Sequence, residues 1–218
     1  MLRMQRRTRI KICGLTREQD VDAAVQAGAD AIGFVLYPPS ARHVSVERAA
    51  QLAARLPAFV MPVALVVNAS DALMASALAA MPHVLLQFHG DETPQICRAA
   101  ARPFIRAARI TTGFDLLDFA AQYPSAQAVL VDAHVDGYGG GGKVFDWLLI
   151  PRRVPLPVVL SGGLHAANVT DAILQVRPWA VDVSSGVESA KGIKDAEAIR
   201  RFCDAVREAD ARIANLET

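Results

Sequence analysis

Four side chains with useful chemistry stand where aliphatic stretches of the sequence end. They are Cys13 after the first stretch, Arg42 in the polar segment after the second, His89 after the fourth and Asp132 after the sixth. A thiol and a carboxylic acid can serve as general base and general acid, and a guanidinium binds carboxylates. Each residue alone also has an ordinary structural explanation, such as a buried apolar cysteine or an aspartate that caps a loop.

Two glycine-containing loops follow the last two aliphatic stretches. They read Ser161-Gly162-Gly163 and Ser184-Ser185-Gly186, and each leads from an expected strand into an expected helix. Backbone N–H groups in such loops, together with the partial positive charge of a helix N-terminus, bind anions. One loop of this kind would indicate only a tight turn, whereas two in the last two units predict a phosphate site.

The thiol of Cys13 needs a positive neighbour to act as a base at neutral pH. Lys11 has the same strand parity as Cys13, so it should face inward one layer below and favour the thiolate. The expected partner for its charge is Asp182, on the strand that would close a barrel against the first strand. Asp132 could donate a proton only if burial raises its pKa.

The glycine tract and the histidines do not indicate a specific site. The four glycines at 139–142 before Lys143 suit an anion contact, a lid or a plain surface loop. The valine after Lys143 excludes a P-loop. The histidines show no spacing typical of metal ligands, so we expect neither a metal nor another cofactor.

Composition limits the class of protein. The chain has 218 residues, of which 52% are hydrophobic, and a net charge of +1. It can therefore bury one large hydrophobic core, and its net charge is too small to attract nucleic acid or a membrane surface. The basic start lacks the apolar region of a secretory signal. The cysteines at 13, 97 and 203 lack metal spacing, which fits reduced thiols in the cytoplasm.

Short aliphatic runs alternate with Ala-rich helical stretches along the chain. The expected strands span residues 9–13, 31–36, 60–67, 83–88, 104–109, 126–131, 158–160 and 180–183. The expected helices span residues 18–27, 46–56, 72–80, 93–101, 114–122, 167–175 and 196–208, with a short or late helix in the sixth unit. Eight such units predict a single (β/α)8 TIM barrel, which collects reactive groups at the carboxyl ends of its strands.

Domain boundaries follow from the same pattern. The barrel is expected over 9–210, after a basic, flexible tail at 1–8 and before a C-terminal tail at 211–218. The alternative is an open doubly wound sheet, against which stands the lack of a G-x-G-x-x-G motif after the first strand.

Several motifs together resemble one enzyme family, phosphoribosylanthranilate isomerase of tryptophan biosynthesis. They are KICGLT (11–16), GADAIGF (28–34), SAR (40–42), QFHG (87–90), LVD (130–132), GK and FDW (142–143 and 145–147), SGGL (161–164) and DVSSGVE (182–188), followed by Gly192, Lys194 and Asp195. The resemblance covers nearly the whole chain in order. It implies a (βα)8 barrel and an Amadori rearrangement of N-(5-phosphoribosyl)anthranilate to the deoxyribulose 5-phosphate isomer, without a cofactor.

The resemblance also implies roles for residues. Cys13 matches the general base, Asp132 the general acid and Arg42 the residue that meets the anthranilate carboxylate, while His89 matches an active-site histidine. The remaining substrate-binding residues expected are Gly162, Gly163, Asp182, Ser184, Ser185 and Gly186. The chain departs from the family pattern at Gly141, where threonine is usual, and at Ala41, which leaves the contact of the glycine loop with substrate open.

Two other functions compete with this hypothesis. One is another sugar-phosphate enzyme on the same barrel, which would need a metal or a catalytic lysine. The other is a phosphate-binding module without catalysis, which would need neither Cys13 nor Asp132. The sequence leaves open a monomer or a homodimer, and also a second, histidine-pathway substrate.

Overall fold

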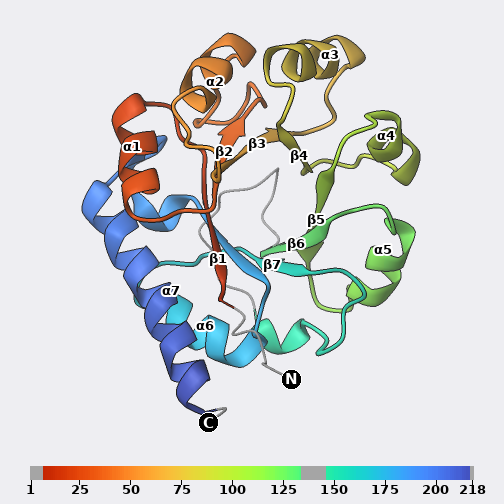
Figure 1. The fold of residues 1–218 in the computed structure, drawn as a ribbon. Helices are drawn as coiled ribbons and strands as arrows, with labels where there is room; N and C mark the ends of the chain where they lie inside the picture. The colour runs from red at the N-terminus through yellow and green to blue at the C-terminus, as the bar shows by residue number, and fades with distance from the viewer. Residues whose placement is uncertain (1–6, 134–145, 217–218) are drawn as a thin grey trace.

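A closed barrel of eight parallel strands forms the centre of the molecule (Figure 1). The computed structural model describes residues 7–133 and 146–216. The barrel strands are β1 (Arg9–Cys13), β2 (Ala31–Val35), β3 (Met61–Val66), β4 (Leu85–Phe88), β5 (Phe104–Ile110), β6 (Ala128–Ala133), β7 (Val158–Leu160) and β8 (Ala180–Val183). Because β1 pairs with both β2 and β8, the barrel is confirmed and the open doubly wound sheet is excluded.

Helices cover the outside of the barrel between the strands (Figure 1). The α-helices are α1 (Glu18–Gln26), α2 (Val46–Ala53), α3 (Asp71–Ala80), α4 (Pro94–Ala99), α5 (Leu116–Gln122), α6 (Val169–Val176) and α7 (Ala196–Leu216). Two short 3-10 helices are η1 (Trp147–Leu149) and η2 (Ser185–Val187), and a small hairpin is made of β9 (Glu188–Ala190) and β10 (Ile193–Lys194). None of the described helices is long and apolar enough to cross a membrane.

Local sequence explains where these helices begin and end. The side chains of Ser45, Ser70 and Thr93 each accept a hydrogen bond from the backbone N–H three residues on. These bonds cap α2, α3 and α4. Gly28 follows α1 with a φ of +86°, the left-handed conformation that suits glycine at a helix end. The sixth unit has only η1 within its described part.

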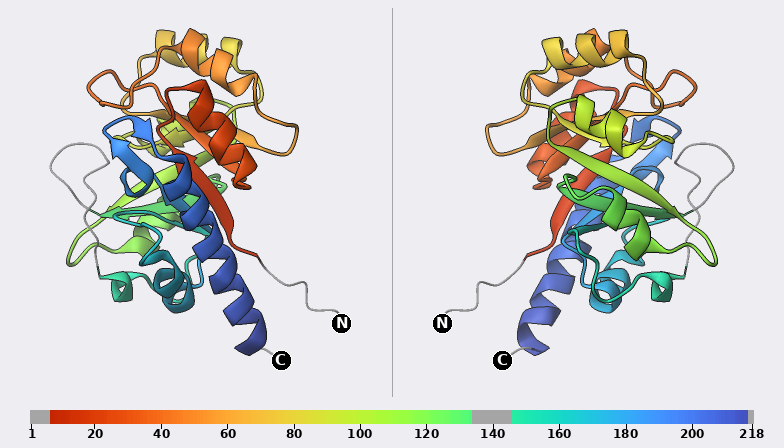
Figure 2. Two further views of the ribbon diagram at one scale, coloured as in Figure 1. Left: turned by 90° about the vertical axis from the view of Figure 1, so that its left-hand side faces the viewer. Right: turned by 90° about the vertical axis from the view of Figure 1, so that its right-hand side faces the viewer.

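The barrel ends differ from the boundaries expected from the sequence. The helix α7 runs on to Leu216, past the end expected at residue 208, because its apolar face continues through Ala209 to Ile213. At the other end, Thr8 is buried, and its backbone N–H donates to Asp210 at 2.8 Å. Thr8, the last residue of the segment expected as a tail, is thus tied to α7. Figure 2 shows α7 running beside β1 along the side of the barrel.

The sixth strand is also displaced from its expected position. It covers Ala128–Ala133, two residues later than expected, since its backbone keeps pairing with β5 as far as Ala133. Asp132 therefore lies inside the strand, where its position in the pleat directs the side chain inward.

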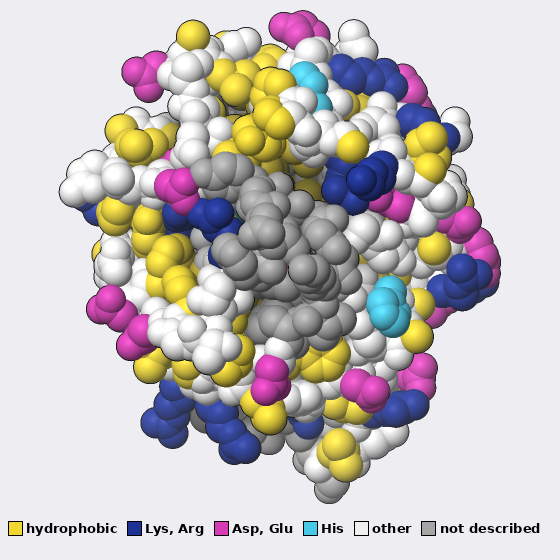
Figure 3. Space-filling model, turned by 180° about the vertical axis from the view of Figure 1, so that it is seen from behind, with side chains coloured by type: hydrophobic (Ala, Val, Ile, Leu, Met, Phe, Trp, Pro, Cys, Tyr) yellow, Lys and Arg dark blue, Asp and Glu magenta, His cyan; other side chains and the backbone are white. Residues whose placement is uncertain are grey.

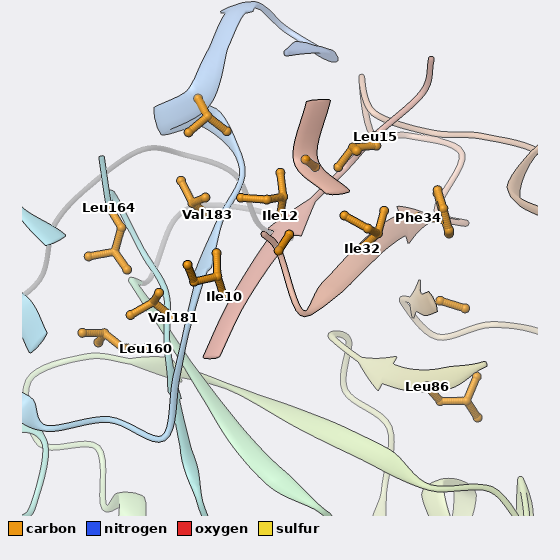
Figure 4. Close-up of a cluster of buried hydrophobic side chains, with 14 of the residues drawn as sticks. Ile10, Ile12, Leu15, Ile32, Phe34, Leu86, Leu160, Leu164, Val181 and Val183 are labelled. Carbon is orange, nitrogen blue, oxygen red and sulfur yellow. The ribbon is translucent and has the colours of Figure 1, made fainter. Parts of the chain in front are cut away.

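Two sets of apolar residues build the core. The larger lies between the strands and the helices, and Figure 4 shows Ile10 and Ile12 of β1 beside Val181 and Val183 of β8. The smaller fills the barrel interior with Ile105, Ala107, Ala128, Leu130, Val159 and Ala180. Because alternate residues of a strand face opposite sides, Lys11, Gln87 and Asp182 also point inward, above this layer.

Candidate active site

A cavity at the carboxyl ends of the strands brings the predicted residues together. Nine of the ten line it: Cys13, Arg42, His89, Asp132, Gly162, Gly163, Asp182, Ser184 and Ser185. The tenth, Gly186, lies next to this wall and packs against the neighbouring loop, where an added Cβ would stand 1.9 Å from the carbonyl oxygen of Leu164. Figure 3 shows Lys and Arg side chains interspersed with Asp and Glu over one face of the molecule, in keeping with the balanced charge.

Cys13 ends β1 with its side chain inside the barrel. It is 4% exposed, and a Cβ at Gly33 of β2 would stand 2.7 Å from its Sγ, so the absence of a side chain on β2 makes room for the thiol. Burial raises the pKa of Cys13 above that of an ordinary thiol, although the charge of Lys11 works in the opposite direction. Lys11 thus favours the thiolate, as expected from the sequence, but in the free protein desolvation outweighs its charge.

Lys11 and Asp182 form a buried ion pair one layer below Cys13. The two residues are partners in the register of β1 and β8, and Lys11 Nζ lies 2.8 Å from Asp182 Oδ1. Burial alone would lower the pKa of Lys11, but Asp182 and Cys13 together outweigh burial, so the pKa of Lys11 is raised. The pairing predicted from strand parity is thus confirmed.

Asp132, on β6, lines the same cavity as the thiol. It is 9% exposed, and His89 Nε2 lies 3.5 Å from its Oδ2. Gln87, two residues before His89 on the same inward side, places its amide Nε2 3.0 Å from His89 Nδ1. With that amide as donor, Nδ1 accepts and the ring proton sits on Nε2, which makes no hydrogen bond within the described residues.

In the sequence, Gln87 stands out only as part of the motif QFHG (87–90). Its signal is a polar residue within an aliphatic strand, two positions before His89. Strand parity places both residues on the same face.

Arg42 is held at the cavity wall by a carboxylate. Its Nε and Nη2 donate to the two oxygens of Glu188 at 2.7 and 2.8 Å, and Lys194 Nζ lies 2.8 Å from Glu188 Oε1. Burial alone would raise the pKa of Glu188, but Arg42 and Lys194 lower it further than burial raises it. Glu188 and Lys194 appeared in the sequence only as part of a motif, since the hairpin that turns them toward Arg42 is a tertiary feature.

The two glycine loops form the wall next to β7 and β8. Gly162 and Gly163 adopt φ values of +84° and +64°. This conformation orients successive backbone N–H groups toward one side. Ser184 donates from its hydroxyl to the carbonyl oxygen of Cys13 at 3.0 Å and receives Lys194 on its own carbonyl at 3.0 Å. Adjacent loops after the seventh and eighth strands are the usual phosphate site of such barrels.

The glycine tract at 139–142, with Lys143 and His134, lies outside the described residues. Within the described part of the chain, no group of three or more His, Cys, Asp or Glu side chains could hold a metal ion. What the cavity offers is one thiol, the buried carboxyl groups of Asp132 and Asp182, one imidazole, one arginine and a pair of glycine loops.

Fold and site together define a (β/α)8-barrel protein with a thiol and a carboxyl group in one cavity beside two glycine loops. The chain belongs to the phosphoribosylanthranilate isomerase family: residues 10–205 match the family model described as N-(5'phosphoribosyl)anthranilate (PRA) isomerase. A relative from Methylibium petroleiphilum is 71% identical over 97% of this chain and 99% of its own length, and one from Leptothrix cholodnii is 70% identical over 94% of each. Both relatives are named N-(5'-phosphoribosyl)anthranilate isomerase.

Solved structures of the family have the same fold. The isomerase from Thermotoga maritima is 39% identical, covers 92% of this chain and 99% of its own and superposes with a TM-score of 0.85. A second, 36% identical with a TM-score of 0.82 over the same shares of the two chains, is a complex with reduced 1-(o-carboxyphenylamino)-1-deoxyribulose 5-phosphate.

Proposed function

We propose that this chain catalyses the isomerisation of N-(5-phosphoribosyl)anthranilate to 1-(2-carboxyphenylamino)-1-deoxyribulose 5-phosphate in tryptophan biosynthesis. The observation that carries the proposal is the placement of Cys13 and Asp132 in one cavity beside the two glycine loops, in a member of this family. A substrate with a phosphate at one end and an aromatic carboxylate at the other suits the loops and Arg42.

Asp132 acts first, as the general acid. It gives a proton to the ring oxygen of the ribose while the nitrogen lone pair forms a double bond to C1 and the C1–O bond breaks. The product is an open-chain Schiff base. Once Asp132 has become a carboxylate, the Nε2–H of His89, whose nitrogen lies 3.5 Å from Asp132 Oδ2, stabilises the charge left there.

Cys13 acts second, as the general base. It removes the proton on C2, and the electron pair moves through C1 to the positively charged nitrogen, giving an enol amine. The enol amine becomes the ketone when C1 gains a proton and the C2 hydroxyl loses one. Because the free thiol is protonated at neutral pH, it must release its proton to solvent before this step. The positive Schiff base and the ammonium groups of Lys11 and Lys194 favour the thiolate once substrate is bound.

The reaction is an internal oxidation and reduction. C2 is oxidised from alcohol to ketone while C1 is reduced, so the class is an aldose–ketose isomerase. The substrate nitrogen accepts the electron pair, and no cofactor is needed. Asp182 contributes by holding Lys11 beneath the thiol and by forming part of the cavity wall.

Turnover of phosphoribosylanthranilate, followed by the loss of anthranilate fluorescence, tests the proposal. The wild type should turn over, and Cys13→Ser should lose about 10²–10⁴-fold in kcat, the usual contribution of a general base. Cys97→Ser is the matched control, because Cys97 is a buried thiol on α4. An inert wild type that still binds a phosphorylated analogue would assign the cavity to another sugar phosphate or to a binding module.

We further propose that the enzyme is cytoplasmic and that it is a monomer or a homodimer. All three cysteines are free and buried, which suits a reducing compartment. One solved relative is a monomeric form generated from dimeric Thermotoga maritima isomerase. Sedimentation of the purified chain decides between the two states.

A further inference from the structure

We propose that Glu188, paired with Lys194, is a positioning residue that orients Arg42 for an aromatic carboxylate and keeps its charge available. This inference rests on the proposed function, and it concerns the recognition of the carboxylate, not the acid–base pair. Three features of the cluster carry it: the donors that Arg42 has left, the charge balance, and the contacts that tie the cluster to Cys13.

The first feature is the edge of the Arg42 guanidinium that Glu188 does not occupy. A guanidinium has five N–H donors in one plane. Arg42 spends its Nε–H and one Nη2–H on Glu188, and its Nη1 donates to no residue in the described part of the chain. One N–H of Nη1 and the second N–H of Nη2 therefore point the same way, in the fork that binds a second carboxylate through two parallel hydrogen bonds. The orientation of that fork is set by Glu188.

The second feature is the charge. The side chains of Arg42, Glu188 and Lys194 are 12%, 6% and 0% exposed, so water screens the cluster little. An isolated Arg42–Glu188 pair would be neutral and would attract an anion weakly. Lys194 compensates Glu188, and the three groups together carry one net positive charge at the cavity wall.

The third feature is the link to the reacting groups. Lys194 Nζ donates to the carbonyl and the hydroxyl of Ser184 at 3.0 and 3.3 Å, and Ser184 Oγ donates to the carbonyl of Cys13 at 3.0 Å. The stem of Arg42 lies against Gly14, where an added Cβ would stand 2.6 Å from Arg42 Cδ. The anchor for the carboxylate is thus fixed relative to the phosphate loop and to the base, which sets where C2 lies under the thiol.

Calorimetric binding of two ligands tests this role. The ligands are reduced 1-(o-carboxyphenylamino)-1-deoxyribulose 5-phosphate and the same compound without its carboxyl group, and the readout is the ratio of their affinities. Glu188→Gln should weaken the carboxylated ligand about 10- to 100-fold, the usual worth of hydrogen bonds to a charged group, and leave the other ligand unchanged. Combined with Arg42→Met, the same substitution should cause no further change in the ratio.

Two further variants keep the test decisive. Glu188→Gln together with Lys194→Met leaves Arg42 as the one charge of the cluster, so its net charge stays at one positive charge as in the wild type. It avoids the two unpaired cations of the single variant, and so reports the ratio even where the single variant fails to fold. Glu197→Gln removes one partner of an exposed Arg–Glu pair on α7 and should leave both affinities as in the wild type. Equal losses for the two ligands, or an unchanged effect in the Arg42→Met background, would overturn the positioning role. A wild type that binds neither ligand and turns nothing over would instead overturn the proposed function.

Discussion

Removal of the ammonium beneath the thiol should destabilise the whole barrel. In Lys11→Met, Asp182 keeps its charge in a site where its side chain is only 6% exposed and loses a partner 2.8 Å away. Breaking a buried ion pair from one side costs about 3–5 kcal/mol of the free energy of unfolding. For a chain of this size, that corresponds to a fall in Tm of about 6–20 °C.

The assay is urea unfolding of three proteins at neutral pH: wild type, Lys11→Met, and Lys11→Met with Asp182→Asn. The double variant should recover most of the lost free energy, because no buried charge is then left unpaired. Since the pKa of Lys11 is raised, the contribution of its charge is complete below the ordinary range of lysine and fades only as the pH rises through the pKa in the folded protein. The gap between wild type and Lys11→Met should therefore narrow above about pH 10.4.

Two results would refute the reasoning. One is a loss in Lys11→Met below about 1 kcal/mol, the range of exposed ion pairs. The other is a double variant as unstable as the single one, which would mean that Lys11 stabilises the barrel by packing and not by its charge.

Three further predictions concern the cavity wall. In Gly33→Ala, the new Cβ would stand 2.7 Å from the Sγ of Cys13 and displace the thiol. Steady-state kinetics should show kcat lowered about 100-fold with little change in KM, and an unchanged kcat would contradict this. In Gly186→Ala, a Cβ 1.9 Å from the carbonyl oxygen of Leu164 would force the two loops apart. Kinetics should show a higher KM for the phosphorylated substrate and urea unfolding a loss of about 1–3 kcal/mol, whereas wild-type values would contradict the close packing. Burial raises the pKa of Cys13. Inactivation of the free protein by iodoacetamide should therefore be slow at neutral pH and keep accelerating above about pH 8.5, and a plateau near neutral pH would contradict it.

The architecture could be predicted from the sequence because each unit repeats the same local pattern. Strands buried on both faces read as aliphatic runs, and strand parity alone placed Lys11 and Cys13 on the inner side. Closure against β8 then brought Asp182 opposite Lys11, as the register of the two strands shows. Boundaries were less accurate where a polar residue continues a strand, as Asp132 does in β6.

Two features of the site depend on the packed structure and could not be predicted. The direction of the pKa of Cys13 follows from how deeply the thiol is buried, which a sequence does not state. The contact between Arg42 and Glu188 spans 146 positions and exists because the β9–β10 hairpin folds back toward the loop after β2. A motif shows that such residues occur together, but not that one orients the other.

An isotope measurement tests most directly whether Cys13 is the general base and Asp132 the general acid. Phosphoribosylanthranilate carrying deuterium at C2 would be compared with the unlabelled substrate in Cys13→Ser and in Asp132→Asn. Removal of the C2 proton should limit the rate in Cys13→Ser, which should show a primary isotope effect. Ring opening should limit the rate in Asp132→Asn, which should show none. The reverse pattern, or equal effects in both variants, would contradict the assignment of Cys13 as base and Asp132 as acid.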